Sequence, residues 1–384
     1  MTEPHTSPPS VASPRRASCL LAAFLALAAV VAGCAGRSTI CHLRWLPKSE
    51  LRKHGGVVHD GFPGPGAGTR VVLVAGDEEY RSEETLPQLA KMLAMRHGFE
   101  CIVLWSTDAE SGDIDPDARG HIPGLEALDG ADMLVLFTRF RRLPDEDMAH
   151  IVDYVESGRP ILGIRTATHA FAYEGDSDSP YAHWSWNASA GSSWPGGFGR
   201  QILGETWVNH HGKHGGESTR GVVAAGAADH LVVRGVSDVW GPTDVYGVRD
   251  LPPDATVLLE GLVLAGMSPD DPPVADERND PPMPLVWARE RAVHAGRTQR
   301  IVTSTIGASV DFASEDLRRL FVNAVYWCTG LEDELSMRAD AQLVGEFEPT
   351  PFGFGGFVPG VRPEDHLLEI PSPGQPPAGA SESR

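Results

Sequence analysis

Two short apolar segments, each followed by a polar turn and a helical pattern, constrain the fold of this chain more than any other feature. Residues 70–75 precede the turn Gly-Asp-Glu-Glu-Tyr at 76–80, and residues 160–164 precede the turn Arg-Thr-Ala-Thr-His at 165–169. A buried strand, a polar turn and a helix form the repeating unit of an open α/β sheet. Ligands of such sheets bind beyond the carboxyl ends of the strands. The two turns therefore predict both a fold class and the place of a site.

Similar patterns extend along residues 70–350, which we expect to form one α/β domain. Strands are predicted at 71–75, 101–105, 131–137, 160–164, 231–233, 257–259, 285–288 and 300–305. Helices are predicted at 85–97, 145–156 and 314–329, where apolar residues recur every three or four positions. These elements predict a three-layer α/β sandwich around a mostly parallel sheet, with the flavodoxin-like strand order 2-1-3-4-5.

The segments outside this pattern have a different composition. Residues 34–69 end in a run rich in Gly and Pro and are interpreted as a flexible tether. Residues 351–384 form a second Gly- and Pro-rich segment, interpreted as a C-terminal tail. Residues 172–235 are rich in Gly, Ser, Trp and His and show little periodicity. A stretch of this length without regular structure is more often functional than filler.

The N-terminal segment has the features of an export signal. Arg15 and Arg16 precede an apolar run at 19–33 that is short for a membrane span. The run ends in Val-Ala-Gly before Cys34, which resembles a bacterial lipoprotein signal with cleavage before Cys34 and lipidation of its thiol. We therefore expect a lipid-anchored protein of the bacterial cell envelope, on the periplasmic or outer-membrane side. An ordinary secretory signal or a single anchor helix are the alternatives.

The composition excludes several classes of partner and cofactor. A net charge of −20 argues against nucleic acid, whose phosphates attract Lys and Arg. Outside the signal and Cys34, the cysteines are Cys41, Cys101 and Cys328, an odd number that implies no disulfide framework. The chain has no P-loop, no G-x-G-x-x-G and no G-x-S-x-G motif. A nucleotide cofactor is therefore not expected, whereas a divalent metal stays open.

Polar side chains follow three strands that neighbour one another in the predicted order. The set is Asp77, Glu78, Glu79, Tyr80, Thr138, Arg139, Arg141, Arg165, Thr166, Thr168 and His169. Acids, guanidinium groups and an imidazole in one crevice separate pKa values, so that similar groups can act as acid and base. A structural ion-pair network between the loops is the competing interpretation.

A histidine-rich loop at 204–215 forms a second constellation. It holds His210, His211 and His214, with Glu205 upstream. Histidine and carboxylate suit zinc. Adjacent side chains point apart in an extended segment, however, so His210 and His211 are not expected to face the same ligand. A metal site, acid/base or sugar-binding histidines, and simple packing stay open.

Aromatic residues and one aspartate lie near this loop. Trp184, Trp186, Trp194 and Trp207 offer flat faces on which a sugar ring could stack, or they pack the loop. Asp244 and Tyr246 are two positions apart and share a face if the segment is extended. Asp244 could orient a histidine, act as a general base, or simply belong to a turn.

These motifs, taken in order, resemble the ThuA-like (trehalose utilization) family. The matching segments are 76–81, 163–171, the histidine-rich loop, 244–246, 303–307 and 318–327. The resemblance covers roughly residues 70–343. It implies the class I glutamine amidotransferase-like fold and a link to glycoside metabolism.

The chain departs from the pattern of this fold at the turn after residue 164. Amidotransferases carry a nucleophilic cysteine there, and many ThuA-like proteins carry a histidine, but this chain has Arg165. A second family histidine, after the late turn, is replaced by Ala308. Arginine has no deprotonated form that could attack a substrate, so glutamine hydrolysis by that route is excluded. His169 and the histidines of 210–214 could compensate.

The resemblance and the residues together lead to three hypotheses. The first is an envelope enzyme that cleaves glycosides or keto-glycosides by hydrolysis or a lyase-type reaction. Its catalytic candidates are His169, His211, Asp77, Glu78 and Asp244, and its substrate-binding candidates are Arg139, Arg165, Thr166, Tyr80, Trp207 and Tyr246. The second is a non-catalytic carbohydrate-binding lipoprotein. The third is a metal-dependent hydrolase using His210, His211 or His214.

Overall fold

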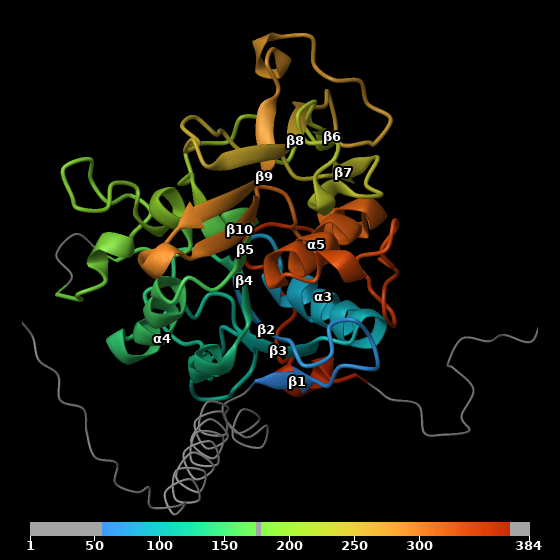
Figure 1. Ribbon diagram of the computed structural model, residues 1–384. Helices are drawn as coiled ribbons and strands as arrows, with labels where there is room; N and C mark the ends of the chain where they lie inside the picture. Colours follow the sequence, from blue (N-terminus) through green and yellow to red (C-terminus); the bar gives the residue numbers. More distant parts are fainter. Residues whose placement is uncertain (1–55, 174–177, 369–384) are drawn as a thin grey trace, which may run out of the picture. The chain divides into compact units, whose positions relative to one another are not determined.

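A ten-stranded sheet runs through the part of the chain that the computed structural model describes, residues 56–173 and 178–368 (Figure 1). Its order is β1-β3-β2-β4-β5-β10-β9-β8-β6-β7. In that order the strands are β1 (Val57–His59), β3 (Glu100–Trp105), β2 (Arg70–Gly76), β4 (Met133–Thr138), β5 (Ile161–Ile164), β10 (Thr298–Ser304), β9 (Met283–Ala292), β8 (Ala255–Val263), β6 (Thr219–Val223) and β7 (Val239–Gly241).

The parallel part of the sheet consists of β3, β2, β4, β5 and β10. Numbered along the chain, these strands have the predicted order 2-1-3-4-5. Every residue of β2 and β4 is buried, because helices cover both faces of a parallel sheet. Their continuous apolar sequences reflect this environment.

The sheet as a whole is mixed, and the prediction of a mostly parallel sheet is wrong. The strands β9, β8, β6 and β7 continue from β10 with antiparallel pairing, and β1 pairs antiparallel with β3 at the opposite edge. A parallel crossover needs a connecting helix or its equivalent. The connection between β8 and β9, residues 264–282, contains no α-helix, and the chain simply turns back. The prediction of parallel pairing for the strands after β5 did not take the length and helix content of their connections into account.

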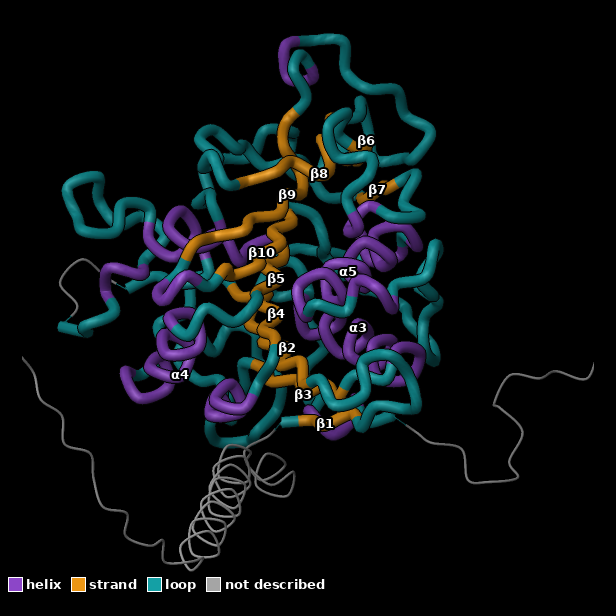
Figure 2. Tube along the Cα trace, in the orientation of Figure 1, coloured by secondary structure: helices purple, strands orange, loops and turns teal. Residues whose placement is uncertain are grey.

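Helices form a layer on each side of the parallel strands (Figures 1 and 2). Helices α3 (Ser82–His97) and α5 (Glu315–Thr329) cover one face, and α4 (Asp145–Glu156) covers the other. Successive side chains of β2 point to opposite faces of the sheet, so this strand contacts both helix layers. Leu73 belongs to the apolar cluster with α3 and α5, whereas Val72 belongs to the cluster with α4. The predicted three-layer arrangement therefore holds around the parallel strands.

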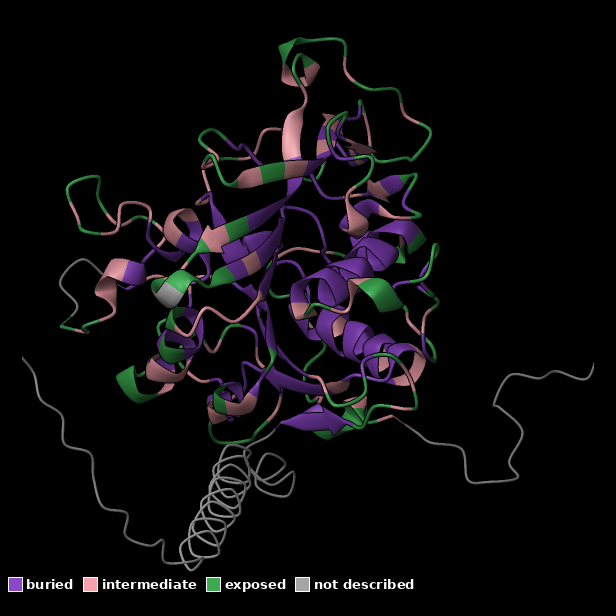
Figure 3. Ribbon diagram, viewed as in Figure 1, coloured by how far each residue is buried: buried purple, intermediate pink, exposed green. Residues whose placement is uncertain are grey.

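Helix α5 is buried on all sides rather than on one face (Figure 3). The segment after it returns across its outer surface, and this segment accepts hydrogen bonds from α5. Arg318 donates to the carbonyl of Ala341, and Arg319 donates to the carbonyl of Ala339. Long polar side chains can lie in a buried helix face when backbone carbonyls satisfy their donors.

The boundaries of the folded domain are wider than predicted. Strand β1 and the residues up to 69 pack on the domain, so the described part of the predicted tether 34–69 is not a tether. The described part of the predicted tail, 351–368, packs on α3. Arg81 donates to the carbonyl of Gly353, and Phe352 stacks on Tyr80 with ring centroids 5.8 Å apart.

Two predictions about the middle of the chain are also corrected. The predicted strand at 231–233 is a short 3-10 helix, Leu231–Val233, because the His230 side chain accepts a hydrogen bond from the Val232 amide and caps it. Strands β6 and β7 were not predicted.

Some expectations concern residues that the structure does not describe. The signal segment 1–33, Cys34, Cys41 and the end of the chain from 369 lie outside the described residues. Among the residues that are described, no helix is long and apolar enough to cross a membrane. Cys101 and Cys328 are buried free thiols.

Candidate functional site

The loops after β2 and β5 meet at a buried aspartate. Oδ1 of Asp77 accepts hydrogen bonds from the backbone amides of Glu79 and Tyr80, each at 2.7 Å. Its Oδ2 accepts a hydrogen bond from the Thr166 hydroxyl, which belongs to the turn after β5. Burial raises the pKa of the Asp77 carboxyl. The structure thus brings together Asp77 and Thr166 at the carboxyl edge of the sheet, and Asp77 organises both loops.

Glu78 lies in an ion-pair network and not in a reactive position. Its carboxylate contacts three guanidinium groups, those of Arg119 at 2.9 Å, Arg139 at 2.6 Å and Arg141 at 2.6 Å. Arg141 is itself fully buried and also donates to the Ser106 hydroxyl. Three guanidinium groups neutralise and fix this carboxylate, so the predicted catalytic role of Glu78 is not supported.

Arg165 occupies the turn at the end of β5 in an unusual conformation. Its φ of +48° lies in the left-handed region, which non-glycine residues seldom adopt. The guanidinium carbon lies 4.4 Å from the ring centroid of Tyr80 and 3.9 Å from that of Tyr246. The side chain is completely buried between these rings. Arg165 and the two tyrosines therefore bind one another, and a direct substrate contact predicted for Arg165 is not supported.

The same guanidinium holds Asp244 in place. Arg165 donates to the Asp244 carbonyl at 2.8 Å and to its Oδ1 at 3.2 Å. Oδ2 of Asp244 lies 2.7 Å from Nδ1 of His210, and Oδ1 lies 3.1 Å from Nδ1 of His214. Burial alone would raise the pKa of Asp244, but the hydrogen bonds with both imidazoles and the Arg165 charge outweigh it and hold the pKa well below its usual range.

This arrangement sets the protonation of the two histidines. A carboxylate can only accept hydrogen bonds, so both Nδ1 atoms that face Asp244 carry hydrogens. The Nε2 of His210 is then left to accept a proton. The Nε2 of His214 lies 3.4 Å from Oε1 of Glu79. The hydrogen bond to Asp244 raises the pKa of His214 although burial opposes it, and burial raises the pKa of Glu79.

The imidazoles of His210 and His214 connect this buried network to solvent. Their side chains are 34% and 36% exposed, whereas Asp244 has no exposed side-chain surface. Glu79 is nearly buried and contacts Nε of Arg139 at 3.3 Å. The pKa values of the Asp244 and Glu79 carboxyl groups shift in opposite directions, and the two histidines between these groups and the solvent are partly exposed. We call the four residues Asp244, His210, His214 and Glu79 the Asp244 cluster.

His211 and Glu205 lie apart from the Asp244 cluster. Nε2 of His211 is 2.8 Å from the carbonyl oxygen of Arg278, while its neighbour His210 faces Asp244. The two adjacent histidines point apart, as the extended segment predicted. Glu205 is buried and pairs with Arg200. The predicted catalytic role of His211 is therefore not supported, and His210 and His214 occupy the position that was expected for it.

His169 packs among aromatic rings beside the Asp244 cluster. Its ring centroid is 5.0 Å from that of Phe140, 5.7 Å from that of Trp207 and 6.1 Å from that of Tyr246. Burial lowers the pKa of His169, and its Nδ1 lies 3.1 Å from the Thr168 hydroxyl. The imidazole is therefore neutral and serves as a packing and hydrogen-bonding group more readily than as a general acid.

The four tryptophans divide between the site and the core. Trp207 packs on His210 with ring centroids 5.8 Å apart, and Trp186 packs edge-on against Trp207 at 5.7 Å. Trp184 and Trp194 stack on each other at 5.1 Å within a different cluster. Only the first pair borders the Asp244 cluster.

The Asp244 cluster has a donor set that suits a divalent transition metal. One ligand atom each from His210, His214 and Asp244 lies within 4.8 Å of the others. Two imidazoles and one carboxylate are a common ligand set for catalytic zinc. These residues, rather than His211, are the metal candidates that the structure supports.

The C-terminal segment contributes to this site, which its sequence did not predict. The ring of Phe352 lies 5.3 Å from that of His214, and the ring of Phe354 lies 5.0 Å from the guanidinium carbon of Arg139. The aromatic residues within the Gly-rich run at 352–357 could have indicated that this segment packs on the domain, because disordered segments contain few aromatic residues.

Comparisons with protein-family models and with curated proteins find no match. Among solved structures, the chain is similar to a protein from Bacteroides uniformis named as ThuA-like, with 17% identity and a TM-score of 0.41, over 70% of this chain and 95% of that one. It is also similar to a protein from Parabacteroides merdae named as ThuA-like, with 15% identity and a TM-score of 0.40, over 74% of this chain and 97% of that one. Both bear the family name that the motifs of this sequence suggested.

The titration of His214 tests the geometry of the Asp244 cluster. Because Asp244 raises the pKa of His214, we expect the imidazole to titrate above its unfolded value of about 6.5. The stabilisation from this contact is then complete below that pH and is lost as the pH rises through the folded pKa. The variant Asp244→Asn should lower the pKa of His214, measured by NMR in the presence of a chelator.

The matched control is Asp250→Asn, which removes an exposed carboxylate elsewhere. It should leave the titration of His214 where it is in the parent protein. Equal His214 titration curves in the parent protein and in Asp244→Asn would contradict the geometry.

Proposed function

We propose that this protein cleaves glycosides or keto-glycosides, by hydrolysis or a lyase-type reaction, with the Asp244–His210 pair as its proton-transfer group. The observation that carries the proposal is the buried Asp244 carboxylate, which contacts two solvent-reaching imidazoles. A carboxylate that orients a histidine through Nδ1 leaves Nε2 to exchange a proton with a substrate.

The two histidines have different roles in this proposal. His210 takes a proton at Nε2 from the attacking water or from a sugar carbon. His214 lies between two carboxyl groups, those of Asp244 and Glu79, and the hydrogen bond with Asp244 raises its pKa. In its protonated form it would stabilise negative charge or donate a proton to the departing sugar oxygen.

The surroundings of the cluster suit a sugar. Trp207 and Trp186 border His210 with flat apolar faces, and Arg139 is close enough to Glu79 to place a guanidinium beside a bound hydroxyl. The motif resemblance to the ThuA-like family, which implies a link to glycoside metabolism, supports a glycoside over other substrates. Glutamine itself is not the proposed substrate, because Arg165 fills the nucleophile position and is buried.

The location of the protein is part of the same proposal. We propose export and lipidation at Cys34, since small residues precede this cysteine at the end of the apolar run. A lipid-anchored enzyme would meet glycosides at the cell envelope. No nucleotide cofactor and no nucleic acid takes part in this proposal.

Replacement of the two adjacent histidines tests the proposal. We expect His210→Ala to lower turnover by about 10²–10⁴-fold, the usual contribution of general acid–base catalysis. His211→Ala should retain most activity, because His211 faces Arg278. The measurement is sugar release from a panel of disaccharides and their 3-keto forms.

The outcomes of this assay separate the proposal from its alternative. Sugars that bind without being cleaved, with affinity lost in Trp207→Ala, would favour a non-catalytic carbohydrate-binding protein. Equal turnover in His210→Ala and His211→Ala would contradict the catalytic role of the Asp244 cluster.

A metal-dependent hydrolase is the second candidate, favoured by the ligand set of His210, His214 and Asp244. A zinc ion bound there would supply an activated water. We expect the protein to bind about one zinc ion tightly, as two imidazoles and a carboxylate commonly do. His214→Ala should weaken zinc binding and His211→Ala should not, as measured by calorimetry. Undiminished activity after removal of all metal would contradict a catalytic metal.

A further inference from the structure

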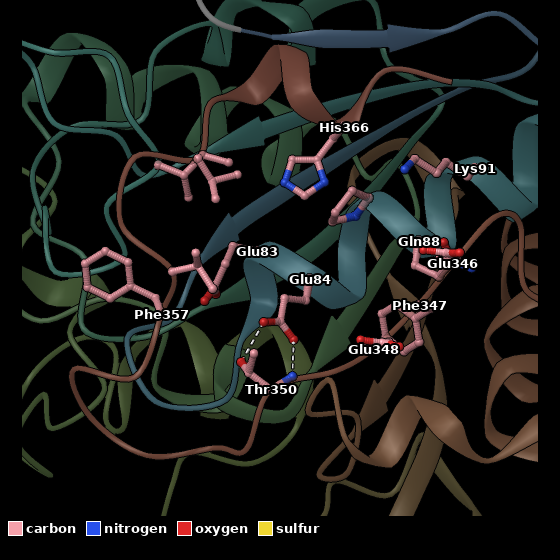
Figure 4. Close-up of a pocket in the computed structure, with 14 residues that line it drawn as sticks. Glu83, Glu84, Gln88, Lys91, Glu346, Phe347, Glu348, Thr350, Phe357 and His366 are labelled. Carbon is pink, nitrogen blue, oxygen red and sulfur yellow. Dashed lines mark hydrogen bonds between the residues drawn. The ribbon is translucent and has the colours of Figure 1, made fainter. Parts of the chain in front are cut away.

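A cavity of about 270 Å³ lies between α3 and the C-terminal segment (Figure 4), and none of its lining residues belongs to the Asp244 cluster. Helix α3 forms its floor, and residues 346–366 form its roof. The apolar part of its lining consists of Pro87, Ile114, Phe347, Phe357, Val358 and Val361. Its size is near the lower end of the range for small-molecule sites, roughly 300–1,000 Å³.

The floor of the cavity carries a carboxyl group without a hydrogen-bond partner. Glu83 is 8% exposed, and neither of its carboxylate oxygens has a partner in the described structure. Figure 4 shows its side chain leaving α3 on the side of Phe357. Burial raises the pKa of Glu83 to about 8. Buried carboxyl groups are normally hydrogen-bonded or paired, so an unpaired one in a cavity indicates a missing donor.

Two nitrogens of the Arg81 guanidinium, two positions before Glu83 in the chain, are engaged elsewhere. The guanidinium of Arg81 donates to the carbonyl oxygens of Gly353 and Glu78. Arg81 therefore fixes the roof to the loop after β2 and does not satisfy Glu83. Its charge lowers the pKa of Glu83, but burial has the larger effect.

Other charged groups around the cavity make it favourable for a cation. Glu84 anchors the roof by accepting hydrogen bonds from the Thr350 amide at 2.9 Å and the Thr350 hydroxyl at 2.6 Å. Glu346 and Glu348 are exposed at its edge.

Two basic side chains lie at one end of the cavity. Burial lowers the pKa of Lys91, and it lowers the pKa of His366 to about 4. His366 is therefore neutral and stacks on Trp105. Lys91 is the one ammonium group among the lining residues, which include four glutamates.

We propose that this cavity binds a small organic cation with an apolar body, such as a primary amine. The ammonium group would donate to the Glu83 carboxylate, and the apolar body would pack against Ile114, Phe357 and Val358. A purely apolar ligand would leave Glu83 unpaired. An anion would be repelled by the carboxylates of Glu84, Glu346 and Glu348.

Calorimetric titration of the purified protein with hexylamine, 1-hexanol and hexanoate tests this site. We expect hexylamine to bind at least about ten-fold more tightly than 1-hexanol, a difference of about 1.4 kcal/mol, and hexanoate not to bind. Glu83→Gln should lower the affinity for hexylamine at least about ten-fold. The control Glu110→Gln removes an exposed carboxylate and should change nothing.

Two further readouts keep the proposal falsifiable if Glu83→Gln folds poorly. Val358→Trp narrows the cavity from an exposed roof position and should weaken hexylamine binding with Glu83 intact. Hexylamine binding should also release protons near pH 7, measured in buffers of different ionisation enthalpy. Equal affinity for amine and alcohol, undiminished binding in Glu83→Gln, or no hexylamine binding below about 10 mM would overturn the proposal. None of these outcomes bears on the glycoside assay.

Discussion

The buried guanidinium of Arg165 is the interaction on which the candidate site depends. It lies between the rings of Tyr80 and Tyr246 and donates to Asp244 and to the carbonyl of Thr305. These partners come from the loops after β2, β7 and β10, while Arg165 itself follows β5. A buried charge is tolerated only when it is paired and its donors are satisfied. The loops must therefore converge on this residue for the chain to fold as it does.

The guanidinium of Arg165 also limits which groups of the site can act as nucleophile, acid or base. It fills the position from which a nucleophile would act, and it adds to the hydrogen bonds from His210 and His214 that lower the pKa of the buried Asp244 carboxyl. The pKa values of Asp77 and Glu79, in contrast, are raised, because burial is the largest influence on both carboxyl groups. Carboxyl groups with opposed shifts are the usual basis for separate acid and base roles. Within the Asp244 cluster, His210 and His214 have the largest exposed side-chain surface, so the proposed function assigns the substrate contacts to them.

The sequence predicts the elements whose environment is uniform. Continuous apolar runs gave the parallel strands and their order, and helix α4 was predicted with its observed bounds, Asp145–Glu156. Strand β7 is the edge of the sheet and β6 is its neighbour, and both are short segments with mixed burial, so their sequences offer little pattern to detect. The principle that polar residues at the carboxyl ends of neighbouring parallel strands lie close together correctly predicted the contact of Asp77 with Thr166. It could not decide between His210 and His211, because that depends on which side of the loop meets Asp244 and which meets Arg278.

A double-mutant cycle on Arg165 and Asp244 tests the central interaction most directly. The variants Arg165→Met, Asp244→Asn and their combination would be compared by the free energy of unfolding in urea. Each single change should cost about 3–5 kcal/mol, because it leaves a buried group without its partner. The account predicts that the double variant loses less than the sum of the single losses, by about 1–3 kcal/mol. Losses that add to within about 0.5 kcal/mol would contradict it.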